Sequence, residues 1–158
     1  MVAMKDFHDL YARYAGDVHR FVTYLSGDPT VADDITSETF LRAWTSSSPI
    51  REATVKPYLF TIARHLYFAE SRRAARHDEL SDSMPSAAPS AADRVEHQAS
   101  LARVLAALRE LPAVDRAALL LRSRDQLPYE DIATALGISL SSAKVKIHRA
   151  RLRLSAVV

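Results

Sequence analysis

The hydrophobic residues at the start of the chain recur at spacings of three and four, which is the period of an amphipathic helix. This pattern predicts a helix over residues 4–26, which Gly27 ends. A second helix is predicted to run to about residue 44, because Asp28 can cap its start and Pro29 suits its first turn. The side chains expected to face the core on this second helix are Val31, Ile35, Leu41 and Trp44.

A third helical pattern begins near Pro57 and continues to the arginine pair that ends at Arg73. Over residues 77–93 the apolar period disappears and serine, alanine and proline dominate, which is typical of a flexible linker. Four further helices are predicted, over residues 93–110, 113–123, 128–136 and 140–155. The chain is therefore predicted to be all-α, with two small helical domains at residues 1–76 and 94–158.

Composition excludes several classes of protein. The 158 residues contain no cysteine, so a disulfide framework, a zinc–thiolate site and a cysteine nucleophile are ruled out. No stretch approaches the roughly 20 apolar residues that a membrane-spanning helix needs. The first eight residues have no apolar signal core. We therefore expect a cytoplasmic protein that uses no cofactor and no metal.

The formal net charge of +2 conceals an uneven distribution along the chain. Residues 1–76 carry a net charge of +1, residues 77–100 carry −4, and residues 101–158 carry +5. The linker is therefore acidic and the C-terminal domain basic. Such asymmetry is a pointer to function.

The C-terminal pattern has the features of a helix-turn-helix. A short predicted helix ends at Leu136, Gly137 supplies a turn that needs a left-handed backbone, and Ser139 can cap the next helix. Ala133 suits a point where two helices cross closely. In DNA-binding modules of this layout the second helix enters the major groove.

The last predicted helix divides into an apolar stripe and a basic outer face when it is mapped at 100° per residue. A solvated surface would explain the charge alone, but the turn glycine, the capping serine and the apolar stripe together favour DNA binding. The stripe is Leu140, Ala143, Ile147, Ala150 and Leu154. Candidate base contacts are Ser141, Ser142, Val145 and Arg149, of which Arg149 could fork onto a guanine. Candidate phosphate contacts are Lys144, Lys146, Arg151 and Arg153, and Ser139 and His148 complete the DNA-binding set.

The third predicted helix interleaves aromatic and cationic residues. This combination suits single-stranded DNA, because rings stack on unpaired bases while cations hold phosphates. Some of these rings could instead belong to the core. The candidates are Lys56, Tyr58, Arg64, His65, Tyr67, Arg72 and Arg73.

The second predicted helix carries acids beside apolar residues that lie off its inward stripe. Phe40 is the main example, and its position beside the acids suggests a docking face for a basic partner. The alternative is that the acids are solvated and Phe40 covers the edge of the core. The candidate docking residues are Asp33, Asp34, Glu38, Phe40, Leu41 and Arg42.

Taken together and in this order, residues 33–44, 57–73, 108–112, 129–133 and 144–151 resemble the motifs of bacterial sigma factors of the extracytoplasmic-function (ECF) group. The resemblance spans about residues 7–154. It implies a transcription initiation factor that is not an enzyme.

On this resemblance, residues 1–76 correspond to sigma domain 2, which binds core RNA polymerase and recognises and melts the −10 element. Residues 94–158 correspond to sigma domain 4, which reads the −35 element. The implied partners are promoter DNA, the clamp of the largest polymerase subunit, the flap of the second-largest subunit and an anti-sigma factor. The acidic linker would thread through the polymerase.

Three positions depart from the family's pattern in the helix that resembles its promoter-melting and −10-reading helix, and Ala69 falls in the −10-reading part. Tyr58 stands where tryptophan is common, His65 where asparagine is usual, and Ala69 where an acid is usual. The base preference at −10 is therefore not carried over from the resemblance.

Two other functions fit parts of the sequence. A stand-alone helix-turn-helix regulator would bind DNA without polymerase, and it would not need the docking helix at residues 33–44. The second alternative is an all-α enzyme, but the chain lacks the paired Glu-x-x-His spacing that a di-metal site in such an enzyme needs. Its only candidate cluster is Asp33, Asp34, Glu38, His65 and Glu70.

Overall fold

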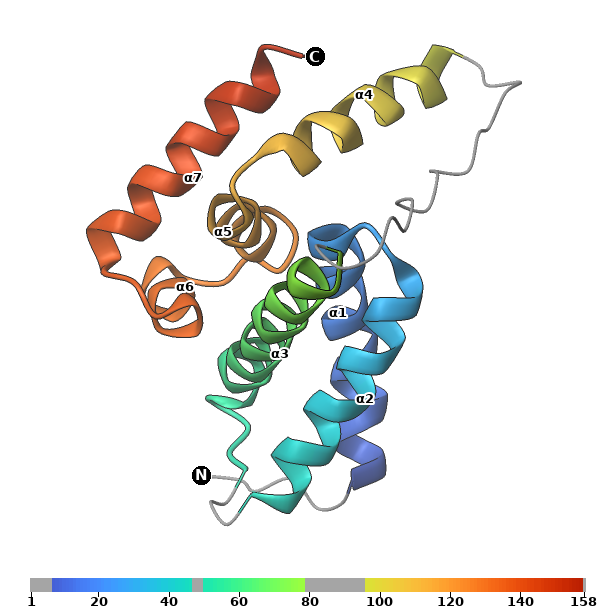
Figure 1. Cartoon of the computed structure of the whole chain (residues 1–158). Helices are drawn as coiled ribbons and strands as arrows, with labels where there is room; N and C mark the ends of the chain where they lie inside the picture. Colours follow the sequence, from blue (N-terminus) through green and yellow to red (C-terminus); the bar gives the residue numbers. More distant parts are fainter. Residues whose placement is uncertain (1–6, 47–49, 79–95, 158) are drawn as a thin grey trace.

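The computed structural model describes residues 7–46, 50–78 and 96–157, which form seven helices, so the all-α prediction is confirmed (Figure 1). The helices are α1 (Phe7–Ser26), α2 (Pro29–Thr45), α3 (Val55–Asp78), α4 (Glu96–Glu110), α5 (Ala113–Ser123), α6 (Tyr129–Leu136) and α7 (Leu140–Ser155). The predicted bounds of α5 and α7 coincide with these. The predicted linker begins inside α3, and its residues 79–93 lie outside the described part of the chain.

Helices α1, α2 and α3 form the N-terminal unit, in which α1 packs along α2 and α3 contacts both. The rings of Phe21 and Phe60 meet edge to face at 5.1 Å in its centre, and both are fully buried. The predicted stop and restart between α1 and α2 are confirmed. Gly27 has a positive φ of 76°, and the side chain of Asp28 accepts a hydrogen bond of 2.9 Å from the Thr30 amide.

The inward stripe predicted for α2 is wrong in part. Leu41 and Trp44 are exposed by 54% and 41%, whereas Phe40 is fully buried. The buried positions follow a regular spacing of three and four, but most of them hold small or polar side chains. They are Ala32, Ile35, Thr36, Thr39, Phe40 and Ala43.

Helices α4 to α7 form the C-terminal unit, in which α5 contacts α4, α6 and α7. Gly137 takes the predicted left-handed conformation between α6 and α7, with φ 66° and ψ 36°. The predicted cap of α7 is also present, because Ser139 Oγ accepts a hydrogen bond of 3.1 Å from the Ser142 amide. The helix-turn-helix therefore forms as the sequence predicts.

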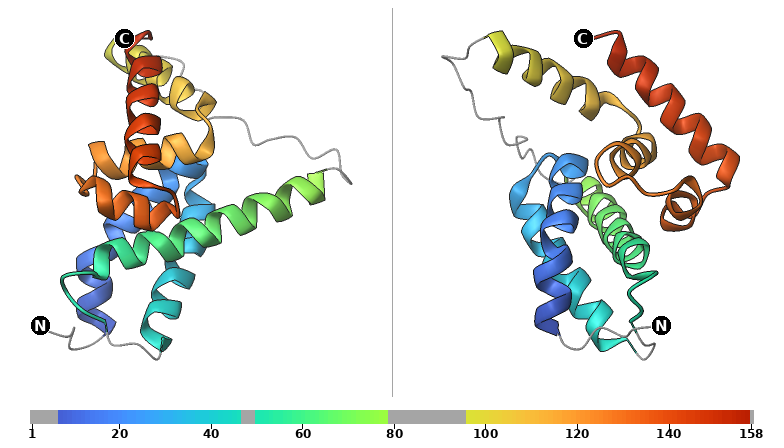
Figure 2. Two further views of the ribbon diagram at one scale, coloured as in Figure 1. Left: turned by 90° about the vertical axis from the view of Figure 1, so that its left-hand side faces the viewer. Right: turned by 180° about the vertical axis from the view of Figure 1, so that it is seen from behind.

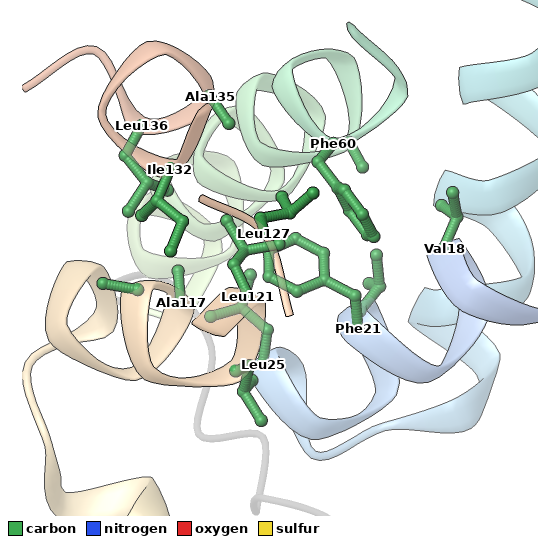
Figure 3. Close-up of a cluster of buried hydrophobic side chains, with 14 of the residues drawn as sticks. Val18, Phe21, Leu25, Phe60, Ala117, Leu121, Leu127, Ile132, Ala135 and Leu136 are labelled. Atoms are coloured by element: carbon green, nitrogen blue, oxygen red, sulfur yellow. The ribbon is translucent and has the colours of Figure 1, made fainter. Parts of the chain in front are cut away.

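The two units pack against each other, with α3 on α6 and α1 on α5. In the two views of Figure 2, α5 and α6 lie between α7 and the N-terminal helices. Figure 3 shows Phe21 and Leu25 of α1 directed toward Leu121 of α5, with Leu127 of the α5–α6 connection beside them. The apolar core is thus continuous across both units.

In the ranges that the structure covers, no helix combines the length and apolar character needed to cross a membrane.

Candidate nucleic-acid and polymerase interfaces

The second helix of the helix-turn-helix is fixed by its apolar stripe. Ala143, Ile147 and Ala150 are buried against the C-terminal unit, as predicted, while Leu140 at the start of α7 is 38% exposed. Because this side of α7 is anchored, the opposite side is held facing outward. The exposed residues of α7 include Ser141, Val145 and His148 on that side, and Lys144, Arg151 and Arg153 beside it.

Arg149 is exposed, as the sequence predicts, but it also forms a two-point ion pair with a buried carboxylate. Its Nε donates to Asp115 Oδ2 at 2.8 Å and its Nη2 donates to Asp115 Oδ1 at 3.0 Å. Lys146 Nζ lies 3.7 Å from the same carboxylate. Sequence reasoning missed Asp115, since an acid in the first turn of a helix usually only complements the helix dipole.

Tyr129, at the start of α6, is a second residue that sequence reasoning did not place in the site. The guanidinium of Arg122 lies 4.3 Å from its ring centroid, and Lys144 Nζ lies 5.7 Å from it. Both distances suit cation–π attraction. Tyr129 thus supports Lys144, the first cation of the basic face.

The single-strand candidates on α3 fall into two groups. Tyr58, His65 and Arg72 are exposed, and so is Arg73, which pairs with Glu70 on the same helix. The half-buried candidates are Lys56, Arg64 and Tyr67. Of the predicted single-strand candidates, the structure therefore leaves only part exposed.

Arg64 is half-buried because the helix-turn-helix covers it. A Cβ placed on Gly137 would lie 3.4 Å from Arg64 Nη2, so the turn passes close to the guanidinium. Burial lowers the pKa of Arg64, and its Nε is a buried donor with no hydrogen-bond partner. Desolvation and the charge of Arg64 lower the pKa of the neighbouring His65, which favours a neutral imidazole.

The charged residues of the candidate docking face on α2 are wholly or partly exposed, and they include both acidic and basic side chains. Glu38 and Arg42 form an ion pair along the helix at 2.9 Å, and Asp33 contacts Nε2 of His19 at 2.7 Å. A groove of about 570 Å³ lies between side chains of α2 and α3. Its lining includes Asp34, Glu38, Arg42, Glu70, Arg73 and Arg76.

Phe40 cannot contribute to this face as the sequence predicts. Its ring is fully buried and meets the ring of Tyr11 edge to face at 5.1 Å. The exposed apolar residues on the outside of α2 are instead Leu41 and Trp44. Phe40 therefore supports the helix from the core side.

Known proteins share both units of this chain. The family models Sigma-70 region 2 and Sigma-70, region 4 match residues 10–77 and 101–154. The ECF RNA polymerase sigma factor SigM of Bacillus subtilis (strain 168) is 32% identical over 151 residues, which cover 94% of this chain and 93% of that protein. This chain belongs to the ECF RNA polymerase sigma factor family.

Two further comparisons agree with this assignment. The ECF sigma factor SigE of Mycolicibacterium smegmatis is 33% identical over 96% of this chain and 61% of its own length. The sigma factor RpoE of Bartonella quintana, solved in complex with the anti-sigma factor NepR, matches with a TM-score of 0.74 at 25% identity, over 98% of this chain and 97% of that one. The present sigma factor therefore directs RNA polymerase to promoters in transcription initiation.

In this sigma factor a buried arginine joins the two units. Arg116, on α5, is only 7% exposed, and its Nε donates to the carbonyl oxygen of Leu25 at 2.9 Å. Its Nη1 donates to the Leu111 carbonyl at 2.9 Å, and its Nη2 donates to the Tyr67 hydroxyl at 3.4 Å. One of the −10 candidates, Tyr67, is therefore held in the contact between the units.

A second arginine acts beside it. Arg109 Nη1 donates to the carbonyl oxygen of Ser26 at 2.8 Å, and its guanidinium occupies the space that a Cβ on Gly27 would fill. The last carbonyls of a helix lack partners within the helix and carry its negative dipole end. Arg109 and Arg116, which we call the arginine clasp, thus bind the C-terminal end of α1.

Proposed function

We propose that this sigma factor reads the −35 element with α7, engages the −10 strand with α3 and docks on core polymerase through α2. The observation that carries the proposal is the outer face of α7 on its helix-turn-helix scaffold. Residues 144–153 hold five basic side chains and no acid. Such a face attracts phosphate, and the anchored stripe of α7 fixes which side meets the groove.

Within α7, the division of roles follows position on the helix. Ser141 and Val145 are exposed on the outer face opposite the buried stripe, which suits contact with base edges. Lys144, Arg151 and Arg153 flank that face and suit contact with phosphates. Ser139 and Ser142 remain tied to the helix start by the capping hydrogen bond.

On α3, we propose that the exposed residues meet DNA first. Tyr58 and Arg72 are accessible, and a neutral His65 can both donate and accept a hydrogen bond at a base edge. Arg64 and Tyr67 would join only after the C-terminal unit has moved away from α3, because the turn after α6 lies against Arg64 and Arg116 of α5 binds the Tyr67 hydroxyl.

For the polymerase, we propose that Asp34, Glu38, Leu41 and Arg42 contact the clamp of the largest subunit, with Asp33 at the edge of this face. An exposed leucine among acids offers both apolar contact and charge to a basic partner surface. The C-terminal unit would meet the flap of the second-largest subunit. The protein would act in the cytoplasm and would itself catalyse no reaction.

An anti-sigma factor is a further proposed partner. The structurally similar RpoE of Bartonella quintana was solved with one bound. For this chain, such a partner would act by keeping α3 and α2 from polymerase and promoter.

The test is reconstitution of the full chain with bacterial core polymerase, followed by transcription on genomic promoter fragments. Two test variants replace Lys144 or Arg151 singly with alanine, and the matched control replaces Arg103, an exposed arginine on α4, with alanine. Loss of phosphate contacts lowers the slope of log affinity against log salt by about one per contact. We therefore expect the salt dependence of promoter binding by the reconstituted holoenzyme to weaken in the test variants and not in the control.

Two outcomes would contradict the proposal. If the wild-type chain does not bind core polymerase, the docking role of α2 fails, and a stand-alone regulator would explain the helix-turn-helix. If the chain initiates transcription but the test variants and the control behave alike, α7 is not the phosphate-contacting helix.

A further inference from the structure

Asp115 is an unusual residue in the C-terminal unit because it is a charged side chain inside the core. It lies in the first turn of α5 and its side chain is 2% exposed. Burial of a carboxylate is unfavourable unless it is paired and hydrogen-bonded. Here Arg149 Nε and Nη2 supply two charge-assisted hydrogen bonds, at 2.8 Å and 3.0 Å.

This ion pair occupies one edge of the Arg149 guanidinium and leaves the other edge available to a second partner. The group has five N–H donors in a fixed plane. Nε and Nη2 face Asp115, while the Arg149 side chain remains 47% exposed on the outer part of α7. The Nη1 end is thus held in one orientation, and the side chain has little freedom to reach different phosphates.

Asp115 also acts on the charge of this flank of α7. Lys146 Nζ lies 3.7 Å from Asp115 Oδ1, so one carboxylate faces two cations of the DNA-binding set. Phosphate attraction that does not depend on sequence grows with the number of free cations. Partial neutralisation of Arg149 and Lys146 lowers that attraction. Contacts that depend on the geometry of particular bases then contribute a larger share of the binding free energy.

We propose that Asp115 is a specificity-determining positioning residue, which holds the free end of Arg149 against the acceptor edge of one guanine in the promoter. The proposal rests on the proposed role of α7 as the −35-reading helix. It keeps the guanine contact that the sequence predicts for Arg149 and adds Asp115 as the group that orients its outer end. Preorganisation of this kind improves discrimination because less side-chain freedom is lost on binding.

The experiment measures binding of reconstituted holoenzyme to a promoter series in which each −35 base pair is changed in turn. The variants are Asp115→Asn, Arg149→Ala and the double mutant. Glu130→Gln is the matched control, because it removes the same charge from the first turn of α6. Asp115→Glu keeps the charge but displaces it by one methylene, and it serves as a second variant if the asparagine form does not fold.

We expect Asp115→Asn and Arg149→Ala to reduce discrimination at the same single base pair, by about tenfold. The double mutant should be no worse at that position than either single mutant. Asp115→Asn should also bind non-promoter DNA more tightly at low salt than the control does, because two cations are released. Asp115→Glu should alter preference at that same position.

A uniform loss of affinity across the series in the Asp115 variants would show a merely structural ion pair and overturn the proposal. Loss of discrimination at different positions in the Asp115 and Arg149 variants would overturn it as well. If wild-type holoenzyme itself has no preference at any −35 position, the proposed role of α7 fails instead. The two failures are therefore distinguishable.

Discussion

Helices α7 and α3 are both amphipathic, basic and proposed to contact DNA, yet their outer faces differ in accessibility. The face of α7 points away from the rest of the protein, and its candidates include the exposed Lys144, Val145 and His148. The face of α3 is partly covered, because the turn after α6 passes close to Arg64 and Arg116 of α5 donates a hydrogen bond to Tyr67. A helix can thus carry the residues for a function while the fold withholds some of them.

The difference concerns long-range packing rather than local pattern. The contacts that cover α3 join residues far apart in the chain, such as Arg116 with Tyr67, which are 49 positions apart. The contacts that orient α7 involve the adjoining helices α5 and α6. Changes that weaken the contact between the units should therefore affect α3 and leave α7 in place.

The largest effect is expected from Arg116→Leu. The substitution leaves the carbonyl oxygens of Leu25 and Leu111 without their donor, and the free energy of unfolding should fall by about 2–4 kcal/mol. Denaturant unfolding measures this change, and hydrogen exchange should rise along α3. Arg103→Leu, at an exposed site, should stay within about 0.5 kcal/mol of wild type. Equal stability of the two variants would mean that the clasp does not hold the units together.

A smaller effect is expected from Gly137→Ala, which tests the turn that touches α3. Its φ of 66° is unfavourable for a residue with a Cβ, so stability should fall by about 1–2 kcal/mol. Gly16→Ala is the control, since Gly16 lies inside α1 and its new Cβ would meet only the flexible Arg20 side chain at 3.3 Å. That control should gain up to about 1 kcal/mol. Thermal melting should show a lower melting temperature for Gly137→Ala and an equal or higher one for Gly16→Ala. Changes of the same sign in the two variants would contradict this explanation.

The smallest effect concerns pH and the contact between the units. Asp125 lies in the α5–α6 connection, in a cavity shared with Asp17, Arg20 and Lys56 of the N-terminal unit. Burial raises its pKa to about 6; the charge of Asp17 also raises it, while the charges of Lys56, Arg124 and Arg20 lower it. Its Oδ2 is buried without a hydrogen-bond partner.

The carboxyl of Asp125 binds its proton more tightly in the folded protein than in the unfolded chain. Its ionisation should therefore lower the free energy of unfolding as pH rises from about 4 through 6. Asp125→Asn removes that loss. The difference in melting temperature between Asp125→Asn and wild type should therefore be larger at pH 8 than at pH 5. A difference that does not change with pH would show that Asp125 titrates normally.

The sequence predicts those parts of the molecule that depend on neighbours along the chain. The bounds of α5 and α7, the caps at Asp28 and Ser139, and the turn at Gly137 follow from local rules and are confirmed. Each depends on residues within a few positions of one another.

The core face of α2 was predicted less well because the prediction favoured large apolar residues over the small and polar residues that occupy the buried positions. Its buried positions include Thr36 and Thr39, which hydropathy does not single out, whereas the large Leu41 and Trp44 are exposed. The buried charges were missed for a different reason. Asp115 and Arg116 resemble ordinary surface residues of a helix start until distant partners are known.

The central claim is that α3 is partly covered in the free protein and uncovered when the sigma factor works. The chain has no cysteine, so two can be introduced for fluorescent labels at Ala75 of α3 and Thr134 of α6, both exposed. Energy transfer between the labels should be high in the free protein and should fall when core polymerase and promoter DNA are added together. Unchanged transfer in a complex that initiates transcription would contradict the claim.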